Sequence, residues 1–458
     1  MTKSIDEFQY PFFIGIAGAG MSALAQYLQG VGKKVSGSDR FFKPGEPNEI
    51  KEKLQAEGIA CFPQTGEGII PQTDLVVVST AVEDSVVEVQ IARQRNIPII
   101  KRSELLALIA SSKKTIAVGG TSGKSTTCAM LFDILEYAGL QPSIISGAGL
   151  VSLIKKGRIG NAMVGAGEWL VIEADESDGS IVQYQPEIGL LLNVEKDHKE
   201  LDALREIFKI FRDNSRKFIV NQSYPATASL SQDIRYDFSV KEKGGAGYKA
   251  SDFQQQGLTI RFSVNEIPFH MNLLGTHNME NALAAVAVAS QLGVDLSTCA
   301  KALEQYEGIY RRNQVLGNKN GVWVIDDFAH NPVKCAAAIR ACQPVASKVI
   351  AWFQPHGYGP TKFLRHDFVE EIAAALRPND EIWMSEIFYA GGTAVKDISA
   401  GDLIADLKAR NRQAFFVEHR SDFLKQARPH FNADCVLLLM GARDPSLENF
   451  AQQVWEQL

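Results

Sequence analysis

The stretch from Thr115 to Thr127 reads Thr-Ile-Ala-Val-Gly-Gly-Thr-Ser-Gly-Lys-Ser-Thr-Thr, and it decides the fold of this chain. Its β-branched and apolar start predicts a strand, its glycines predict a tight loop, and the apolar residues as far as Leu135 predict a helix. Such a loop directs backbone N–H groups at an anion, and the helix adds about half a positive charge at its N-terminus. Lys124 supplies a mobile charge for the β- and γ-phosphates of ATP, and the Ser125 hydroxyl is a ligand for Mg²⁺. The residues predicted to bind the triphosphate are Gly120, Thr121, Ser122, Gly123, Lys124, Ser125 and Thr126.

A glycine-rich turn between a strand and a helix can also serve packing alone. Val118 stands where the longer phosphate-loop pattern has its first glycine, so the match is to the shorter form Gly-Thr-Ser-Gly-Lys-Ser. The lysine and the hydroxyls favour the nucleotide interpretation, because packing does not require them.

Length and composition limit the classes of protein that the chain can belong to. Its 458 residues suffice for about three domains, and 45% hydrophobic with 22% charged residues is typical of a soluble globular protein. A net charge of −6 without a basic run argues against nucleic acid as a partner. The six cysteines form no CxxC pair, and no apolar run reaches the roughly 20 residues of a membrane span. We therefore expect a cytoplasmic enzyme that acts on small molecules and has no membrane partner.

Residues 1–110 predict a small α/β domain that ends at a polar hinge around Ser111. A strand leads into Gly18-Ala19-Gly20-Met21-Ser22-Ala23, and Asp39 follows a second strand. This spacing fits the dinucleotide fingerprint, in which the turn holds a pyrophosphate and the acid holds a ribose. The pattern leaves two ligands open, because NAD and any other nucleoside diphosphate ask the same of the turn.

Two further buried strands end in polar residues. The strand from Trp169 runs into four carboxylates between Glu173 and Asp178, and the strand from Ile188 ends in Asn193, Asp197 and His198. Ligands bind at the carboxyl ends of parallel strands, and clustered acids favour Mg²⁺, although a solvated acidic turn is the alternative. Further on, Asn278 and Asn281 lie three residues apart on a predicted helix, so both amides would share one face and could bind a base edge.

Taken together and in this order, these motifs resemble the Mur ligases. The motifs are the phosphate loop, Glu-Ala-Asp-Glu-Ser-Asp at 173–178, Asn193 with Asp197-His198, and His-Asn-x-x-Asn at 277–281. The family joins amino acids to UDP-N-acetylmuramic acid in peptidoglycan synthesis with ATP, through an acyl phosphate, and the chain looks most like the members that add L-alanine. The resemblance implies three domains: a Rossmann-like UDP-binding domain at 1–110, a phosphate-loop ATPase domain at 111–313, and a Rossmann-like amine-binding domain at 314–458. It favours UDP over NAD for the first domain, with Gly18, Ala19, Gly20, Met21, Ser22 and Asp39 as substrate-binding residues.

The resemblance also implies roles for individual residues. Glu176 and His198 match the family's Mg²⁺ ligands, beside Ser125. Arg312 matches an arginine that reaches the ATP phosphates, although Asn313 replaces the aromatic residue that usually follows. Asp-Asp-Phe-Ala-His-Asn-Pro at 326–332 matches an element near ATP and the incoming amino acid. The predicted catalytic residues are Lys124, Glu176, His198, Arg312 and Asp327; Asn278, Asn281 and His330 are predicted to contact the nucleotide, and His356 the substrate.

One departure from the family pattern concerns the amine. Members that add alanine carry two arginines after Gln-Pro-His, and here those positions are Gly357 and Pro360, so the fork that Arg offers a carboxylate is absent there. We expect weaker selectivity for free L-alanine, with Lys362, Arg365 or Arg443 meeting the carboxylate instead. A recycling ligase that adds a tripeptide or another amine is an alternative, and a nucleotide-dependent binding protein without catalysis is a second. The sequence predicts no oligomeric state.

Overall fold

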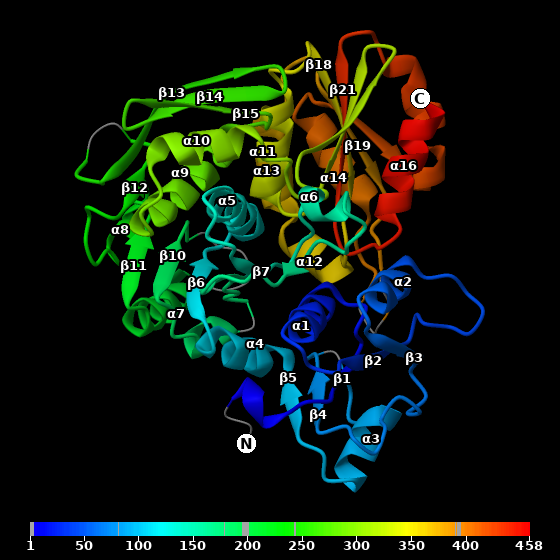
Figure 1. Cartoon of the computed structure of the whole chain (residues 1–458). Helices are drawn as coiled ribbons and strands as arrows, with labels where there is room; N and C mark the ends of the chain where they lie inside the picture. Colours follow the sequence, from blue (N-terminus) through cyan, green and yellow to red (C-terminus); the bar gives the residue numbers. More distant parts are fainter. Residues whose placement is uncertain are drawn as a thin grey trace. The chain divides into compact units, whose positions relative to one another are not determined.

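The structure is a computed structural model that describes residues 4–80, 82–177, 179–194, 201–241, 244–389, 391 and 395–458. It contains three large sheets with mostly parallel strands, and helices connect those strands (Figure 1). The predicted α/β class is thus confirmed. The chain divides into two compact units. The first comprises Met1–Asp252, Phe262–Phe269 and Glu280–Ile309, and the second comprises Phe253–Arg261, His270–Met279 and Tyr310–Leu458.

The first sheet has five parallel strands in the order β3-β2-β1-β4-β5. Its central strand, β1, is buried at every position, and the order reverses on its two sides, which is the arrangement that binds nucleotides in doubly wound folds. The strands are β1 (Pro11–Ile14), β2 (Ser36–Asp39), β3 (Ala60–Pro63), β4 (Leu75–Val78) and β5 (Ile99–Lys101), and the helices are α1 (Ala19–Gly30), α2 (Glu49–Ala56), α3 (Val87–Gln94) and α4 (Arg102–Ser111).

The second sheet has the order β11-β10-β6-β9-β7-β8, with β7 and β8 antiparallel. Strand β6 lies between β10 and β9, so the loop that follows it is flanked by the ends of two neighbours. The strands are β6 (Lys114–Gly119), β7 (Ser143–Ile145), β8 (Ala162–Met163), β9 (Trp169–Glu173), β10 (Ile188–Leu191) and β11 (Lys217–Val220), and the helices of this region are α5 (Lys124–Tyr137), α6 (Val151–Ile154), α7 (Leu201–Asn214), α8 (Pro225–Ala228), α9 (Thr276–Gln291) and α10 (Leu296–Glu304).

One hydrophobic core joins these two sheets. It contains Phe13 and Leu24 from the region of the first sheet together with Leu170 and Phe211 from that of the second, and all four are almost completely buried. Burial of apolar area is the main stabilising contribution to folding. The predicted domain at 1–110 and the large sheet of the second predicted domain therefore lie within a single compact unit.

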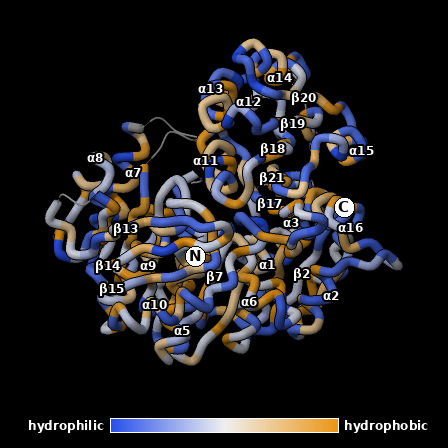
Figure 2. The backbone as a smooth tube through the Cα atoms, turned by 90° about the horizontal axis from the view of Figure 1, so that it is seen from above, coloured by the Kyte–Doolittle hydropathy of each residue, from blue (hydrophilic) through white to orange (hydrophobic). Residues whose placement is uncertain are grey.

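The second unit is built on a sheet with the order β16-β17-β21-β18-β19-β20, in which β16 alone among the described strands is antiparallel to its neighbour. Strand β21 is hydrophobic along its length and fully buried, as a central parallel strand must be (Figure 2). The strands are β16 (Gln314–Lys319), β17 (Val322–Asp327), β18 (Lys348–Gln354), β19 (Glu381–Ser385), β20 (Gln413–Val417) and β21 (Cys435–Gly441), and the helices are α11 (Pro332–Cys342), α12 (Tyr358–Phe363), α13 (Arg365–Ala375), α14 (Ala400–Ala409), α15 (Phe423–Ala427) and α16 (Leu447–Gln457).

A small fourth sheet contributes residues to both units. Within it, the β13–β14 turn, Phe253–Arg261, and the segment His270–Met279 belong to the second unit. Leu274 is buried in the core of that unit, and the Gln255 side chain donates a hydrogen bond to the carbonyl of Ala341 (2.9 Å). The strands of this sheet are β12 (Phe238–Ser239), β13 (Tyr248–Gln256), β14 (Thr259–Val264) and β15 (Ile267–Met271).

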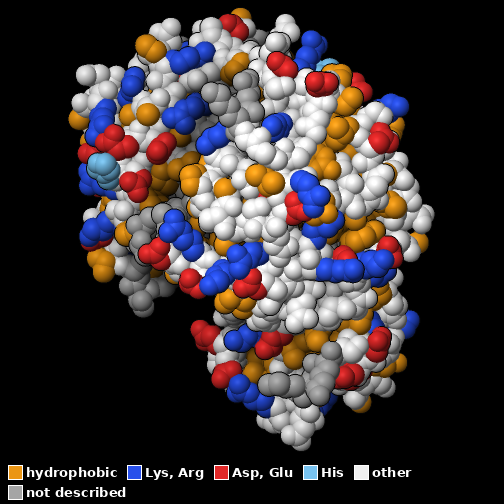
Figure 3. All heavy atoms as spheres, turned by 90° about the vertical axis from the view of Figure 1, so that its left-hand side faces the viewer, with side chains coloured by type: hydrophobic (Ala, Val, Ile, Leu, Met, Phe, Trp, Pro, Cys, Tyr) orange, Lys and Arg blue, Asp and Glu red, His pale blue; other side chains and the backbone are white. Residues whose placement is uncertain are grey.

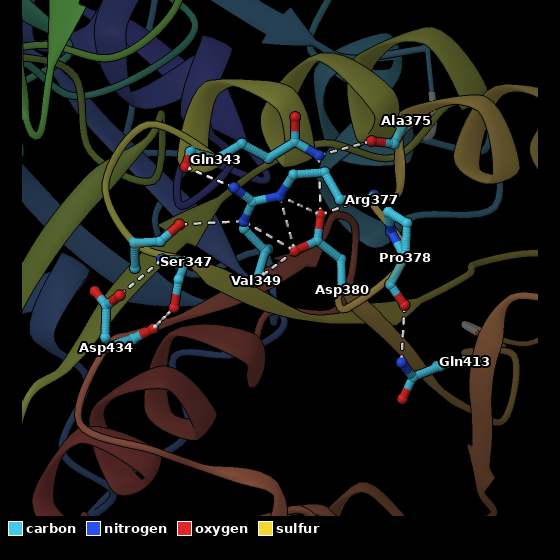
Figure 4. A network of polar contacts seen from close by, with 10 residues as sticks. Gln343, Ser347, Val349, Ala375, Arg377, Pro378, Asp380, Gln413 and Asp434 are labelled. Atoms are coloured by element: carbon cyan, nitrogen blue, oxygen red, sulfur yellow. Dashed lines mark hydrogen bonds and ion pairs between the residues drawn. The ribbon is translucent and has the colours of Figure 1, made fainter.

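An ion pair with a buried carboxylate supports the strand starts in the second unit (Figure 4). The Arg377 guanidinium contacts the Asp380 carboxylate at 3.0 Å and also donates to the carbonyls of Gln343 and Ala346. Asp380 additionally accepts hydrogen bonds from the Val349 N–H and the Gln343 side chain, and its own side chain is fully buried. Both members of the pair are thus held by neutral neighbours as well as by each other.

The last features of the fold are the charges on one face of the molecule and the cysteine thiols, which form no disulfide. On the face drawn in Figure 3, acidic and basic side chains are interspersed instead of gathering by sign. All six cysteines are free, and five of them are buried. Among the described residues, no helix combines the length and the apolar character needed to cross a bilayer.

Candidate active site

The predicted strand, glycine loop and helix are present as β6, residues 120–123 and α5. Gly120 has φ +131° and Gly123 has φ +89°, which are conformations that side chains rarely adopt. A Cβ atom at Gly123 would also lie 2.3 Å from Oδ1 of Asn281. Glycine is therefore required at both positions, and the loop keeps its backbone open toward the start of α5.

Asn193 fixes this loop from the neighbouring strand. The Ser122 N–H donates to Asn193 Oδ1 (2.8 Å), and Asn193 Nδ2 donates back to the Ser122 carbonyl (3.0 Å). The sequence analysis placed Asn193 at a strand end but gave it no role. The signal was available, because an amide that follows a strand parallel to the phosphate-loop strand ends beside that loop.

Lys124 lies between the loop and the acidic strand end. Its ammonium contacts the Gly120 carbonyl and Glu176 Oε2, each at 2.7 Å, and Asp175 Oδ1 at 4.0 Å. Burial opposes the charge on Lys124, yet Glu176 and Asp175 hold its pKa above the ordinary value of a lysine. The predicted residues Lys124 and Glu176 are thus brought together as an ion pair. His198 and Asp178 lie outside the described residues.

The remaining predicted nucleotide residues lie on α5, on the loop before it and on α9. Ser125 and Thr126 are half-buried in its first turn, and Thr121 is buried in the loop. Asn281 Oδ1 accepts a hydrogen bond from the Thr127 hydroxyl (3.3 Å). Asn278, in contrast, donates its amide to the Leu274 carbonyl (2.8 Å), so the two amides meet different partners.

The N-terminal turn is held by its acid. Asp39 is 5% exposed, and its carboxylate accepts hydrogen bonds from the N–H groups of Ala17 (2.9 Å) and Phe41 (3.0 Å). The turn itself continues into α1, with Gly18 as the N-cap and Ala19, Gly20, Met21 and Ser22 in its first turn. Met21 and Ser22 point into the protein, since they are 3% and 1% exposed. The backbone of this turn is what remains available to a ligand.

In the second unit, two adjacent acids end β17. Asp326 forms a buried pair with Arg311, with Nε at 2.9 Å from Oδ2, and burial raises the pKa of Asp326 to about 6 in spite of the arginine. Asp327 accepts hydrogen bonds from the N–H groups of Asn313 (2.6 Å) and Ala329 (2.8 Å). Arg312 lies over the ring of Phe328, with Cζ 4.7 Å from its centroid. The arginine buried against an acid is therefore Arg311, which the sequence analysis did not single out.

Two histidines lie beside these acids. The rings of His330 and His356 are 5.7 Å apart, and His330 Nδ1 is 2.8 Å from the Phe328 carbonyl oxygen. Burial, with Lys334 adding to it, lowers the pKa of His330 to about 3, so this ring is neutral at physiological pH. The structure thus brings together the predicted residues Asp327, His330 and His356 at the strand ends of β17 and β18.

The altered loop after β18 has its own backbone requirement. Gly357 has φ +73°, so an arginine at this position would be strained. The neighbouring cations already have partners: Lys362 Nζ lies 2.5 Å from Asp397, and Arg365 Nε lies 2.7 Å from Asp406. The loop at Gly357 thus adopts a backbone conformation that favours glycine.

Comparison with known proteins agrees with this fold and site. Three family models match consecutive parts of the chain: the Mur ligase catalytic domain at 12–114, the Mur ligase middle domain at 118–289, and the Mur ligase glutamate ligase domain at 311–443. The family matches, together with the phosphate loop, identify an ATP-dependent, amide-forming ligase. The chain belongs to the Mur ligase family.

Individual relatives cover nearly the whole chain. A UDP-N-acetylmuramate--L-alanine ligase from Bdellovibrio bacteriovorus is 34% identical over 88% of this chain and 89% of its own length. One of the same name from Pelotomaculum thermopropionicum is 34% identical over 96% of each. The crystal structure of the UDP-N-acetylmuramate-alanine ligase of Thermotoga maritima has a TM-score of 0.79 at 27% identity and covers 98% of both chains. A murein peptide ligase from Psychrobacter arcticus shares the fold, with a TM-score of 0.68 at 22% identity.

Proposed function

We propose that this chain joins L-alanine to the lactyl carboxylate of UDP-N-acetylmuramic acid in peptidoglycan synthesis. The carboxylate attacks the γ-phosphoryl group of ATP, ADP leaves, and an acyl phosphate forms. The amine then attacks the acyl carbon, and phosphate leaves as the amide forms. In this proposal residues 1–110 bind the UDP part, residues 111–313 bind ATP, residues 314–458 bind the amine, and the protein works in the cytoplasm.

The observation that carries the proposal is the Lys124–Glu176 pair beside the open glycine loop. A triphosphate bound to the loop would offer Lys124 a more highly charged partner than one carboxylate. Lys124 would then turn to the transferred phosphoryl group, and Glu176 would be released for a cation. Positioning and charge neutralisation of this kind account for most of the catalysis of phosphoryl transfer.

The residues near Lys124 suit Mg²⁺, which prefers oxygen ligands and keeps several waters. The Ser125 hydroxyl and the Glu176 carboxylate are the donors we assign to it, with His198 added on the family resemblance. When bound, the ion would neutralise charge on the phosphates during transfer. Within the described part of the chain, no group of three His, Cys, Asp or Glu side chains forms a site by itself.

Roles for the second unit follow from its strand-end cluster. We assign Arg312 and Asp327 to the ATP phosphates, His330 to the nucleotide side of this cluster and His356 to the substrate side. The low pKa of His330 means that it acts as a neutral donor or acceptor and not as a cation. Asn278 and Asn281 are assigned to the nucleotide.

A second candidate function is the attachment of a peptide or another larger amine. It is favoured by one observation: the positions of the expected carboxylate clamp are Gly357 and Pro360, while Lys362 and Arg365 already contact Asp397 and Asp406. A free amino acid brings its carboxylate into the site, and an unpaired buried charge costs several kcal/mol. A peptide could leave that charge in solvent.

The test is phosphate release from ATP with UDP-N-acetylmuramic acid and a panel of amines. The proposal expects release that requires both UDP-N-acetylmuramic acid and L-alanine. Release with a tripeptide but not with L-alanine would select the second candidate. Phosphate release with no dependence on UDP-N-acetylmuramic acid would contradict both. The Lys362→Ala/Arg365→Ala double variant should change the KM for L-alanine by less than about threefold, because paired surface charges contribute little.

A further inference from the structure

A buried polar cluster joins α1 to the segment before β8. Asn161, Gln26 and Ser22 are 2%, 2% and 1% exposed. Asn161 Nδ2 donates to the Ala19 carbonyl (2.8 Å) and to the Ser22 hydroxyl (3.0 Å), and Asn161 Oδ1 accepts from Gln26 Nε2 (2.7 Å). Both amide protons and the amide oxygen of Asn161 are thus used, and two of the three bonds end on the first turn of α1.

The same residue continues toward the phosphate loop. The Asn161 carbonyl accepts a hydrogen bond from the Ser146 N–H (2.8 Å). The Ser146 hydroxyl donates to Glu173 Oε1 (2.8 Å), which also accepts from the Gly147 N–H (2.6 Å). Glu173 ends β9, and its charge acts on Lys124. A continuous chain of hydrogen bonds therefore leads from the glycine turn at Ala19 to a carboxylate that acts on the phosphate-loop lysine.

We propose that Asn161 is a positioning residue that couples ligand binding at the glycine turn to ligand binding at the phosphate loop. The inference rests on the proposed function, in which that turn holds the UDP part of the substrate. A ligand that shifts the first turn of α1 must either carry Asn161 with it or break hydrogen bonds of buried groups, and unmade buried hydrogen bonds are costly. Displacement of Asn161 then reaches Ser146 and Glu173 through bonds of the same kind.

Coupling of this sort is reciprocal: each ligand must raise the affinity for the other by the same factor. Such coupling would raise the affinity for ATP when the acceptor carboxylate is bound. A purely structural role for Asn161 makes a different prediction, since loss of a buried amide would then lower stability and leave the relation between the two ligands unchanged.

The experiment measures the Kd of a non-hydrolysable ATP analogue for the full-length chain by calorimetry, with and without saturating UDP-N-acetylmuramic acid. We expect the wild-type Kd to fall roughly fivefold or more when the sugar nucleotide is present, which is ordinary for coupled sites. We define the coupling ratio as the Kd of the analogue without the sugar nucleotide divided by its Kd with it. In Asn161→Ala this ratio should approach one, while the Kd of the analogue alone stays unchanged. The KM for UDP-N-acetylmuramic acid should rise about tenfold.

Two further variants separate coupling from stability. Gly30→Ala perturbs the same helix at its far end, where a Cβ atom would lie 2.7 Å from Val164 Cγ2, and it should lower the melting temperature but keep the wild-type ratio. Ser146→Ala keeps Asn161 and removes its side-chain link to Glu173, so it should lower the ratio even if Asn161→Ala does not fold. A wild-type ratio in both the Asn161 and the Ser146 variants, or a ratio of one in the wild-type chain, would overturn the inference. Failure of the wild-type chain to bind the sugar nucleotide at all would instead remove the proposed function on which it rests.

Discussion

Two ion pairs, one taken from each unit, join a cation to a buried carboxylate but serve different ends. Lys124–Glu176 lies after the end of β6, whereas Arg377–Asp380 lies just before the start of β19. Arg377 contacts two carbonyls besides its acid, and Asp380 accepts from neutral donors on two further elements (Figure 4). Lys124 has one carbonyl besides its carboxylate partners, and it stands at an open helix N-terminus.

The difference shows how a permanent pair can be told from an exchangeable one. A planar guanidinium that several fixed acceptors hold has no better partner to move to, while a compact ammonium on a flexible stem does once a phosphate arrives. The location agrees, because ligands bind at the carboxyl ends of parallel strands and not at their starts. Arg377 should therefore matter for stability and Lys124 for turnover.

The largest expected effect is on the permanent pair. Arg377→Met leaves Asp380 buried without its cation, so the free energy of unfolding in urea should fall by about 3–5 kcal/mol. The KM values of the folded protein should not change. Arg93→Met is the matched control, since it breaks an exposed pair with Asp84 that contributes about 1 kcal/mol or less. A loss for Arg377→Met no larger than that of the control would make the two pairs alike and break the comparison.

The exchangeable pair should show its main effect in turnover. Lys124→Ala removes the charge aimed at the transferred phosphoryl group, so kcat should fall by about 10² or more. Some stability should be lost as well, because Glu176 is only 7% exposed and is left without its cation. Lys114→Ala serves as the control in phosphate-release assays, because Lys114 is exposed at the start of β6, the strand that leads into the phosphate loop. Turnover near the wild-type rate would refute the phosphate-loop assignment.

How far the sequence predicts this site depends on the range of the interactions. The strand, loop and helix around Lys124 were predictable because apolar periodicity and glycine placement are local properties. Asn193 and Asn161 were missed as contributors, since each acts on a segment more than 70 residues away, and pattern along the chain does not report such distances. Arg311 was not singled out for a similar reason, because its partner Asp326 lies on β17, 15 residues further along the chain.

A third carboxyl, on the half-buried Asp133, extends the comparison to one without an ion-pair partner in the described part of the chain. Asp133 makes no hydrogen bond or ion pair with any described residue, and burial, followed by Glu307 and Glu136, raises its pKa to about 7. The folded chain thus binds a proton that the unfolded chain releases near pH 4. Its stabilising contribution is full below that pH and is lost as the pH rises through 7.

For Asp133 we predict that replacing the carboxyl raises the stability of the fold by an amount that depends on pH. Asp133→Asn should be more stable than the wild-type chain, and its advantage in urea unfolding should grow by about 2 kcal/mol between pH 5 and pH 8. Asp84→Asn, at an exposed acid, should show no such growth. An advantage that is independent of pH would mean that Asp133 keeps an ordinary pKa and finds a partner in solution.

The smallest expected effect concerns Glu176, the acid that Lys124 would release when it turns to a phosphate. Glu176→Gln keeps the size of the side chain but removes an anionic ligand, so the Mg²⁺ concentration for half-maximal turnover should rise about tenfold. Glu168→Gln removes an exposed acid just before β9, the strand that leads to Glu176, and should leave the Mg²⁺ titration unchanged. Identical titrations for the two variants would show that Glu176 only neutralises Lys124.

The segments Phe253–Arg261 and His270–Met279 have a consequence for how this gene can be divided or recombined. Although they precede residue 310, they pack with the second unit through Leu274 and the Gln255–Ala341 hydrogen bond. If two family members were recombined at residue 310, the second unit of one parent would be joined to the 253–261 and 270–279 segments of the other. Exchange of the second unit between family members should therefore succeed where residues 253–261 and 270–279 are transferred with it, so that Leu274 and its core contacts come from one parent.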